Sequence, residues 1–202
     1  MRDNIFYLKT KFYKSVISLK DLPIDEGSEI AFCGRSNSGK STLLNTITNN
    51  KKLAKTSKTP GRTQTLNIFC IDEFCQKRIV DLPGYGFAKV SKNLRKEWGY
   101  IINQYLSSRL SLKGLILIMD IRQALKESDL MLIKWSKKNY IPLKVVLNKG
   151  DKLSKSKVIK EIKSAERKLE DLSFEGKPLP FSSKSLMGVD ELRETLNNWF
   201  KI

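Results

Sequence analysis

The chain contains no histidine. General-base catalysis by histidine and histidine-ligated metals are therefore excluded, so an oxygen-ligated Mg²⁺ is the expected ion. Cysteine is scarce too, with three residues and no paired metal-ligand spacing. We expect Cys33, Cys70 and Cys75 to be unpaired buried thiols in a reducing cytosol.

Long apolar runs are also absent, and no stretch is long enough to cross a membrane. Residues 1–20 mix lysine, aspartate and aromatic side chains, so we expect no signal peptide, a cytoplasmic location and no membrane partner. The 202 residues are 40% hydrophobic and show no repeat or low-complexity linker. These features predict one domain over residues 1–202, with residues 1–28 as an N-terminal extension packing on it, and a monomer.

Acidic residues are few relative to basic ones: 21 against 38, a formal net charge of +17. Two explanations remain open, a lysine-rich surface without a partner or an electrostatic footprint for a polyanion such as nucleic acid. Two stretches concentrate the basic residues: Lys51, Lys52, Lys55, Lys58 and Arg62, then Lys89, Lys92, Arg95 and Lys96.

Strand and helix patterns alternate along the chain, which predicts an α/β fold with a mostly parallel sheet covered by helices on both faces. Expected strands are residues 29–34, 65–71, 77–82, 115–119, 143–147 and 179–181; expected helices are 40–48, 94–106, 125–139, 158–172 and 189–200. Ligands bind such folds at the carboxyl ends of the strands, and the motifs below follow strands.

The first motif is a phosphate-binding loop between a strand and a helix. Its pattern of two glycines, a lysine and a serine lets backbone N–H groups surround a nucleotide's phosphates. Lys40 should bridge the β- and γ-phosphates, and Ser41 should place its hydroxyl on Mg²⁺. The residues predicted to bind here are Gly34, Arg35, Ser36, Asn37, Ser38, Gly39, Lys40, Ser41 and Thr42.

The second motif, Asp81-Leu82-Pro83-Gly84, follows another strand. Asp81 is expected to reach Mg²⁺, and the Gly84 N–H is expected to contact the γ-phosphate and move when that phosphate leaves. Between the two motifs lies a polar segment in which a threonine can bind Mg²⁺. Thr63 is the first choice because it lies just before a strand, Thr59 is the alternative, and an ordinary surface loop is the competing interpretation. The segment's predicted nucleotide-binding residues are Gly61, Arg62, Thr63, Gln64 and Thr65.

The third motif, Asn148-Lys149-Gly150-Asp151, ends a buried strand and fits a guanine base. The Asp151 carboxylate can accept from guanine N1–H and the exocyclic amine, a donor pair that adenine lacks. Asn148 would orient the base, and the Lys149 stem would cover one of its faces. After the last strand, a backbone N–H in the run Phe181, Ser182, Ser183 and Lys184 could donate to the guanine carbonyl. Together the motifs predict a Ras-like G domain of the P-loop NTPase type that hydrolyses GTP.

With these motifs the chain resembles the EngB (YihA/YsxC) family of bacterial GTPases, nearly from end to end. The matching segments are residues 34–37, 39–41, 59–64, 81–86, 119–122 and 181–183. The resemblance implies a single-domain GTPase that acts in maturation of the large ribosomal subunit and is linked to cell division and septation. It also implies ribosomal RNA or a precursor subunit as partner. Gln123 and Ala124 replace the family's His and Pro, which puts any role of that loop in doubt.

Tyr85 stands where Ras-like switches carry the glutamine that orients the attacking water, so we expect slow intrinsic hydrolysis. Related GTPases with asparagine at the position of Asn37 use K⁺ where others use an arginine finger; a purely loop-stabilising Asn37 is the alternative. Arg62 acting in cis is a weaker candidate. The residues expected to act in hydrolysis are Asn37, Lys40, Thr63 and Gly84, and the expected metal ligands are Ser41, Thr63 and Asp81.

Two other functional classes remain open at this point. One is a P-loop ATPase or small-molecule kinase, which the guanine motif disfavours. The other is a nucleic-acid-binding module whose nucleotide binding is vestigial; its binding to RNA would not change between GDP and a GTP analogue.

Overall fold

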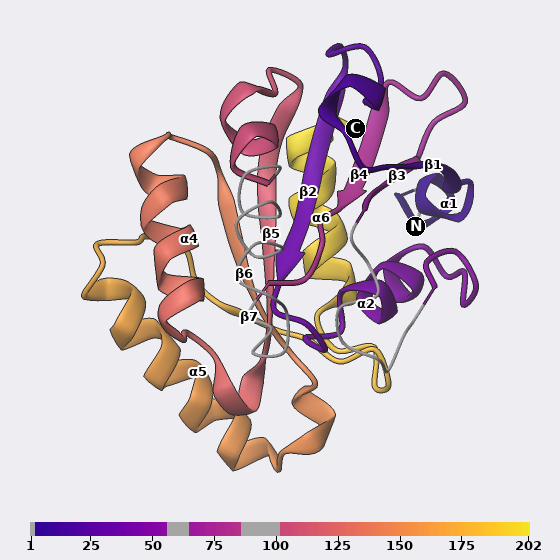
Figure 1. Ribbon diagram of the computed structural model, residues 1–202. Helices are drawn as coiled ribbons and strands as arrows, with labels where there is room; N and C mark the ends of the chain where they lie inside the picture. Colours follow the sequence, from indigo (N-terminus) through magenta and orange to yellow (C-terminus); the bar gives the residue numbers. More distant parts are fainter. Residues whose placement is uncertain (1–2, 56–64, 86–101) are drawn as a thin grey trace.

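A computed structural model describes residues 3–55, 65–85 and 102–202. Its centre is a seven-stranded sheet in the order β1-β3-β4-β2-β5-β6-β7 (Figure 1). β1 pairs antiparallel with β3 and β3 antiparallel with β4, whereas the four remaining pairs are parallel. The predicted mostly parallel sheet is therefore confirmed.

The strands are β1 (Lys11–Val16), β2 (Ser28–Gly34), β3 (Leu66–Cys70), β4 (Lys77–Asp81), β5 (Leu112–Asp120), β6 (Leu143–Asn148) and β7 (Leu179–Pro180). The helices are α1 (Asp3–Leu8), α2 (Lys40–Ile47), α4 (Glu127–Lys138), α5 (Lys155–Glu170) and α6 (Val189–Phe200). Residues 102–108 are also helical; the rest of the helix predicted over 94–106 lies outside the described residues. None of the described helices is long and apolar enough to span a membrane.

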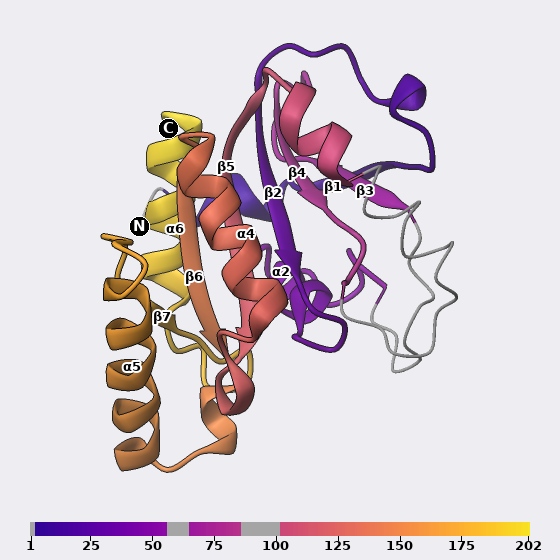
Figure 2. The same cartoon turned by 60° about the vertical axis from the view of Figure 1, so that its left-hand side comes forward.

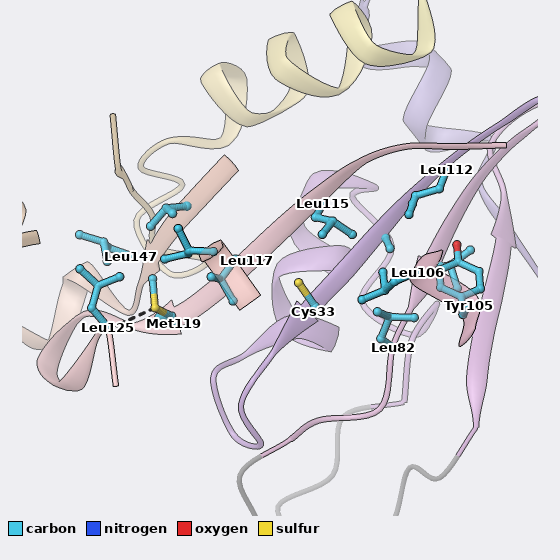
Figure 3. Close-up of a cluster of buried hydrophobic side chains, with 14 of the residues drawn as sticks. Cys33, Leu82, Tyr105, Leu106, Leu112, Leu115, Leu117, Met119, Leu125 and Leu147 are labelled. Carbon is cyan, nitrogen blue, oxygen red and sulfur yellow. Dashed lines mark hydrogen bonds between the residues drawn. The ribbon is translucent and has the colours of Figure 1, made fainter. Parts of the chain in front are cut away.

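Each face of the sheet carries its own apolar core, because side chains alternate along the strands. On one face α1, α2 and α6 cover residues such as Phe32 and Ile118. On the other face the helical residues 102–108, α4 and α5 cover Cys33, Leu117 and their neighbours (Figure 3). In Figure 2, β6 runs between α6 and α4, which makes the helix–sheet–helix layering visible. This architecture confirms the predicted placement of helices on both faces.

The N-terminal segment contributes a strand that the sequence did not indicate. β1 lies at the edge of the sheet, and its register on β3 shifts between Phe12 and Lys14. Only Val16 of β1 is buried, so the strand lacks the alternation by which strands are recognised. The first part of the chain thus enters the sheet itself and does more than pack against it.

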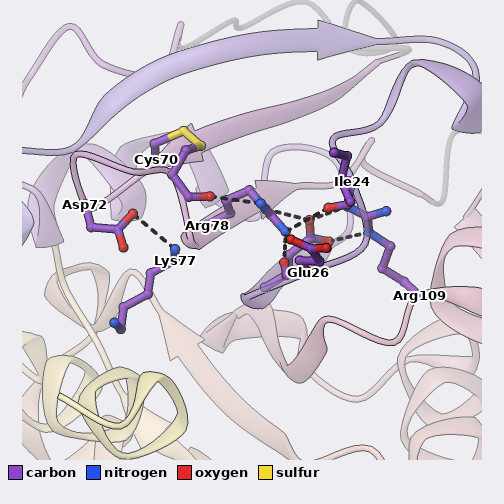
Figure 4. The surroundings of a disulfide bond; sticks show 9 residues. Ile24, Glu26, Cys70, Asp72, Lys77, Arg78 and Arg109 are labelled. Carbon is purple, nitrogen blue, oxygen red and sulfur yellow. Dashed lines mark hydrogen bonds and ion pairs between the residues drawn. A yellow bond between two sulfur atoms is a disulfide. The ribbon is translucent and has the colours of Figure 1, made fainter.

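The expectation of three unpaired cysteines is wrong for two of them. Cys70 and Cys75 form a disulfide, with their Cα atoms 4.7 Å apart (Figure 4). Cys70 ends β3 and Cys75 lies just before β4, so the turn between these antiparallel strands brings the two thiols together. Cys33 is free and buried as predicted, and burial raises the pKa of its thiol to about 12.

The amino-terminal end of the sheet contains a buried ionic cluster around Glu29, which is 0% exposed. Its carboxylate accepts from Arg78 Nε at 2.8 Å and from Arg109 Nη2 at 2.8 Å, and the Tyr105 hydroxyl donates to it at 2.9 Å. Arg78 also donates to the carbonyls of Cys75 and Glu26 (Figure 4). The cluster thereby ties β2 and β4 to the helical residues 102–108.

Candidate functional site: a guanine-nucleotide pocket

The phosphate-binding loop joins β2 to α2 at the carboxyl end of the sheet (Figure 1). Gly39 precedes α2 with φ of 97°, a backbone conformation that favours glycine. A Cβ at this position would collide with the Asn148 side-chain amide. Glycine is therefore required both by the turn into α2 and by the close approach of Asn148 at the end of β6.

The last residue of β6 and the first residue after it are hydrogen-bonded directly to the phosphate-binding loop. Asn148 Nδ2 donates to the Ser38 carbonyl at 2.9 Å, and Lys149 Nζ donates to the Asn37 carbonyl at 2.6 Å. Asn37 itself has φ of 59°, a left-handed conformation that asparagine tolerates better than most residues. Asn148 thus has a structural role between the two loops, and its predicted contact with the base stays a prediction.

Asp120, at the end of β5, orients Lys149. Its Oδ2 lies 3.0 Å from Lys149 Nζ and 2.6 Å from Arg122 Nη2. Burial alone would raise the pKa of Asp120, but hydrogen bonds from Arg122 and Lys149 outweigh it and hold that pKa well below its usual value. The carboxylate is therefore charged at neutral pH and fixes the lysine against the phosphate-binding loop.

The loop after β4 lies against the same phosphate-binding loop. The Ser36 N–H donates to the Tyr85 carbonyl at 3.0 Å, and the Tyr85 N–H donates to the Gly34 carbonyl at 3.4 Å. A Cβ built on Gly84 would lie 3.1 Å from Ser36 N and 3.3 Å from Lys40 Nζ. Gly84 is thus beside the lysine predicted to bind the γ-phosphate.

Asp81 supplies a carboxylate suited to a hard cation. Its Oδ1 is buried without a hydrogen-bond partner, and burial raises its pKa to about 6 although Lys40 opposes the shift. The described residues contain no cluster of three or more acidic, histidine or cysteine ligands. An oxygen set of one carboxylate and the Ser41 hydroxyl fits Mg²⁺, which retains several waters and binds through few protein ligands.

The guanine motif is held by the segment after β7. Ser182 Oγ donates to Asp151 Oδ1 at 2.8 Å, and the Gly150 N–H donates to the Phe181 carbonyl at 3.0 Å. The N–H groups of Lys184 and Ser185 both donate to Ser182 Oγ at 3.2 Å. One serine hydroxyl therefore fixes the carboxylate and the loop that faces it.

Within the described part of the chain, the backbone N–H groups of Ser182 and Lys184 already donate hydrogen bonds. Ser182 N–H donates to the Met187 carbonyl at 3.1 Å, and no described bond uses the Ser183 N–H. Ser183 is therefore the best-placed member of this run to donate to a guanine carbonyl.

The structure brings the described members of the predicted site to one edge of the sheet. These are residues 34–42, 81–84, 148–151 and 181–184. Thr65 lies just before β3, where its hydroxyl donates to Asn67 Oδ1 at 3.2 Å. Thr59, Gly61, Arg62, Thr63 and Gln64 lie outside the described residues.

Three side-chain contacts of the site were not predicted from the sequence: the ion pair of Asp120 with Lys149, the hydrogen bond from the Ser182 hydroxyl to Asp151, and the hydrogen bond from Tyr85 to Asp129. The partners in these pairs are 29, 31 and 44 residues apart in the order given. One feature of the sequence could have indicated a role for Asp120 and Ser182: like the predicted site residues, both follow predicted strands.

Comparison with known proteins identifies the family. Residues 29–149 match the family model described as "50S ribosome-binding GTPase". The "Probable GTP-binding protein EngB" of Aliivibrio fischeri (strain MJ11) is 46% identical over 200 residues, covering 99% of this chain and 92% of the relative. The chain belongs to the EngB family of GTP-binding proteins. The EngB protein of Mannheimia succiniciproducens is 44% identical and covers 96% of this chain and 94% of its own length.

Solved structures agree on the fold. The crystal structure of a probable GTP-binding protein EngB has a TM-score of 0.67 at 22% identity and covers 86% of this chain and 99% of its own. Era in complex with MgGDPNP and a segment of 16S ribosomal RNA has a TM-score of 0.66 at 24% identity, covering 86% of this chain and 57% of Era. The fold is the GTPase G domain, and this EngB-family chain is a GTPase that binds GTP and GDP. The ATPase and kinase interpretation is thereby set aside.

Proposed function

We propose that this EngB-family GTPase is a cytoplasmic, monomeric nucleotide switch that acts in assembly of the large ribosomal subunit. The observation that carries the proposal is the match to a family model described as a 50S ribosome-binding GTPase. The formal charge of +17 supports a partner made of RNA. Of the basic residues singled out in the sequence, Lys51, Lys52 and Lys55 are exposed in the segment that follows α2. We also propose a linked requirement for normal cell division and septation, as the family resemblance implies.

In the proposed switch, the γ-phosphate binds between the phosphate-binding loop and the loop after β4. Lys40 holds the β- and γ-phosphates, and the N–H of the adjacent Gly84 reports whether the γ-phosphate is present. Asp81, Ser41 and Thr63 would hold Mg²⁺, which neutralises phosphate charge when bound. The buried, unpartnered Oδ1 of Asp81 supports this assignment.

We propose slow intrinsic hydrolysis, completed by another element on the ribosome. The Tyr85 hydroxyl donates to Asp129 at 2.8 Å, so this side chain is directed to α4 and supplies no group to orient the attacking water. Asn37 and K⁺ remain the candidates for offsetting charge between the β- and γ-phosphates. Hydrolysis measured in K⁺ and in Na⁺, with and without ribosomal subunits, should be fastest with both K⁺ and subunits. Equal turnover in all four conditions would refute this part of the proposal.

Sedimentation with isolated ribosomal subunits tests the switch. The protein should co-sediment with large subunits or their precursors in a GTP analogue and much less in GDP. A variant with Lys51, Lys52 and Lys55 changed to glutamate should bind subunits less tightly while its GDP affinity is unchanged. Association that is independent of the nucleotide would instead support the nucleic-acid-binding module with vestigial nucleotide binding.

Removal of magnesium tests the proposed metal ligands. Chelation of Mg²⁺ by EDTA should weaken GTP-analogue binding, and Asp81→Asn should lose most of the difference between the Mg²⁺ and EDTA conditions. Titration with a fluorescent GTP analogue measures both. An unchanged response of the Asp81→Asn protein to EDTA would remove Asp81 from the metal site.

A further inference from the structure

Tyr85 is held from two directions. Its backbone pairs with the phosphate-binding loop through the Ser36 N–H and the Gly34 carbonyl. Its side-chain hydroxyl donates to Asp129 Oδ1 of α4 at 2.8 Å. The residue that directly follows Gly84 is thus fixed by its backbone to the phosphate-binding loop and by its side chain to α4.

Asp129 is itself held in place independently of Tyr85. It is 0% exposed, and its Oδ2 accepts the Lys126 N–H at 3.0 Å, which closes the first turn of α4. The two carboxylate oxygens therefore have different partners, one within α4 and one in the loop after β4. A buried carboxylate that anchors a helix gives Tyr85 a fixed point of attachment.

The Tyr85 side chain has space to move if that bond is lost. It borders an apolar cavity of about 510 Å³ that is also lined by Leu82, Ile102, Leu106 and Trp135. Burial raises the pKa of Tyr85, so the hydroxyl keeps its proton and remains a donor. The ring also packs against the apolar core on this face, so the hydrogen bond to Asp129 is the polar contact that sets where the hydroxyl lies.

We infer that Asp129 is a positioning residue that, through the Tyr85 hydroxyl, holds Gly84 against the phosphate-binding loop and so sets the preference for GTP over GDP. The inference rests on the proposed contact of the Gly84 N–H with the γ-phosphate. GDP lacks that phosphate, so its binding does not depend on where Gly84 lies. Loss of the Tyr85–Asp129 bond therefore weakens GTP binding selectively.

The test is the ratio of the dissociation constants for GDP and a non-hydrolysable GTP analogue, measured with fluorescent nucleotides. Tyr85→Phe removes only the hydroxyl, and we expect about a tenfold loss of GTP-analogue affinity, as for a hydrogen bond to a charged acceptor, with GDP affinity unchanged. Asp129→Ala should give a similar loss in the ratio. The double variant should lose no more than either single variant, because both remove one interaction.

Tyr105→Phe is the matched control. It deletes a second buried tyrosine–carboxylate bond, to Glu29 at 2.9 Å, at the other end of the sheet. It should lower the melting temperature without changing the nucleotide ratio. Asp129→Asn keeps one acceptor oxygen, so it should change the ratio of the two dissociation constants less than Asp129→Ala does. It also keeps the inference testable if the alanine variant does not fold.

Gly84→Ala separates this inference from the proposed γ-phosphate contact. If Gly84→Ala shifts the ratio and Tyr85→Phe does not, the positioning role of Asp129 is overturned while the contact stands. If neither shifts it, both are overturned. Equal losses of GDP and GTP-analogue affinity in Tyr85→Phe would also overturn the inference, because they would indicate a general structural role.

Discussion

The two ends of the sheet contain polar clusters that differ in how their buried groups are satisfied. At the carboxyl end, Ser38 Oγ, Asp81 Oδ1 and Ser183 Oγ are buried without hydrogen-bond partners among the described residues. At the amino end, Glu29 has partners for both carboxylate oxygens. Among the described residues there, Ser111 Oγ alone is buried without a hydrogen-bond partner. Unpaired buried groups cost stability, so their concentration at one end is what we expect where a ligand supplies the missing partners.

The comparison separates ligand binding from stability. The cluster around Glu29, at the amino end of the sheet, joins β2 and β4 to the helical residues 102–108 through interactions that need no ligand. The unpaired groups at the carboxyl end of the sheet belong to the loops predicted to bind the nucleotide and its cation. Changes at the two ends should consequently affect different measurements.

The largest expected effect is on base recognition at the carboxyl end. Asp151→Asn should reduce the preference for GTP over ATP by about 10³-fold or more, because the carboxylate that pairs with the guanine donors is lost. Competition against a fluorescent guanine nucleotide measures it. Xanthine has a carbonyl where guanine has its exocyclic amine, so xanthosine nucleotides should bind this variant better than the wild type. Retained guanine preference would contradict the assignment of Asp151.

At the amino end the expected effect is on folding. Glu29→Ala should lower the free energy of unfolding by about 3–5 kcal/mol, because it leaves two buried arginines without their shared partner. Urea denaturation with and without GDP gives the value. Glu26→Ala is the control: this exposed neighbour contributes its carbonyl, so the change should stay within about 0.5 kcal/mol. A loss below about 1 kcal/mol in Glu29→Ala would show that the cluster does little for stability.

A smaller stability effect is expected from the disulfide beside this cluster. Reduction, or the pair of changes Cys70→Ser and Cys75→Ser, should lower the free energy of unfolding by about 2 kcal/mol, since the bond closes a short loop. Nucleotide affinity should not change. Thermal denaturation with and without a reductant measures the effect of the disulfide on stability. The double variant is the control, because it has no disulfide and should not respond to the reductant. A changed GDP affinity would indicate that the two ends are coupled.

The smallest expected effect is from Ser182→Ala. The hydroxyl orients Asp151 and accepts two backbone N–H groups, so its loss should weaken GTP and GDP binding about tenfold and equally. Ser185→Ala is the matched control, because this exposed neighbour donates only its backbone N–H to Ser182 Oγ, and alanine keeps that N–H. If the two variants behaved alike, the hydrogen bond from Ser182 to Asp151 would have no part in recognition.

The sequence allowed the local parts of the fold and site to be predicted. The loop between β2 and α2 and the end of β6 are recognised by residues within a few positions of one another. Their placement at one edge then follows from parallel strands. Glu29 was assigned to a strand, but nothing near it in sequence reveals Arg109, which lies 80 positions away.

The remaining features depend on contacts between distant segments or on weak patterns. β1 was missed because a shift in register and exposure of Phe12 remove the alternation of a half-buried strand. The disulfide was missed because the cysteines were expected to be thiols in a reducing cytosol, although strands were expected at residues 65–71 and 77–82 on either side of the turn. In the sequence, Asp129 cannot be told from an ordinary acidic residue in the first turn of a helix. Only the structure reveals the tyrosine that donates to it.

The β3–β4 hairpin has a mechanical consequence. β3 begins directly after the segment that contains Thr63, and β4 ends at Asp81. The disulfide closes the tip between these strands covalently, and four paired positions join them from Asn67 with Asp81 to Cys70 with Arg78. Because these four pairs fix the register of β3 on β4, a displacement at the open end of one strand is transmitted to the open end of the other.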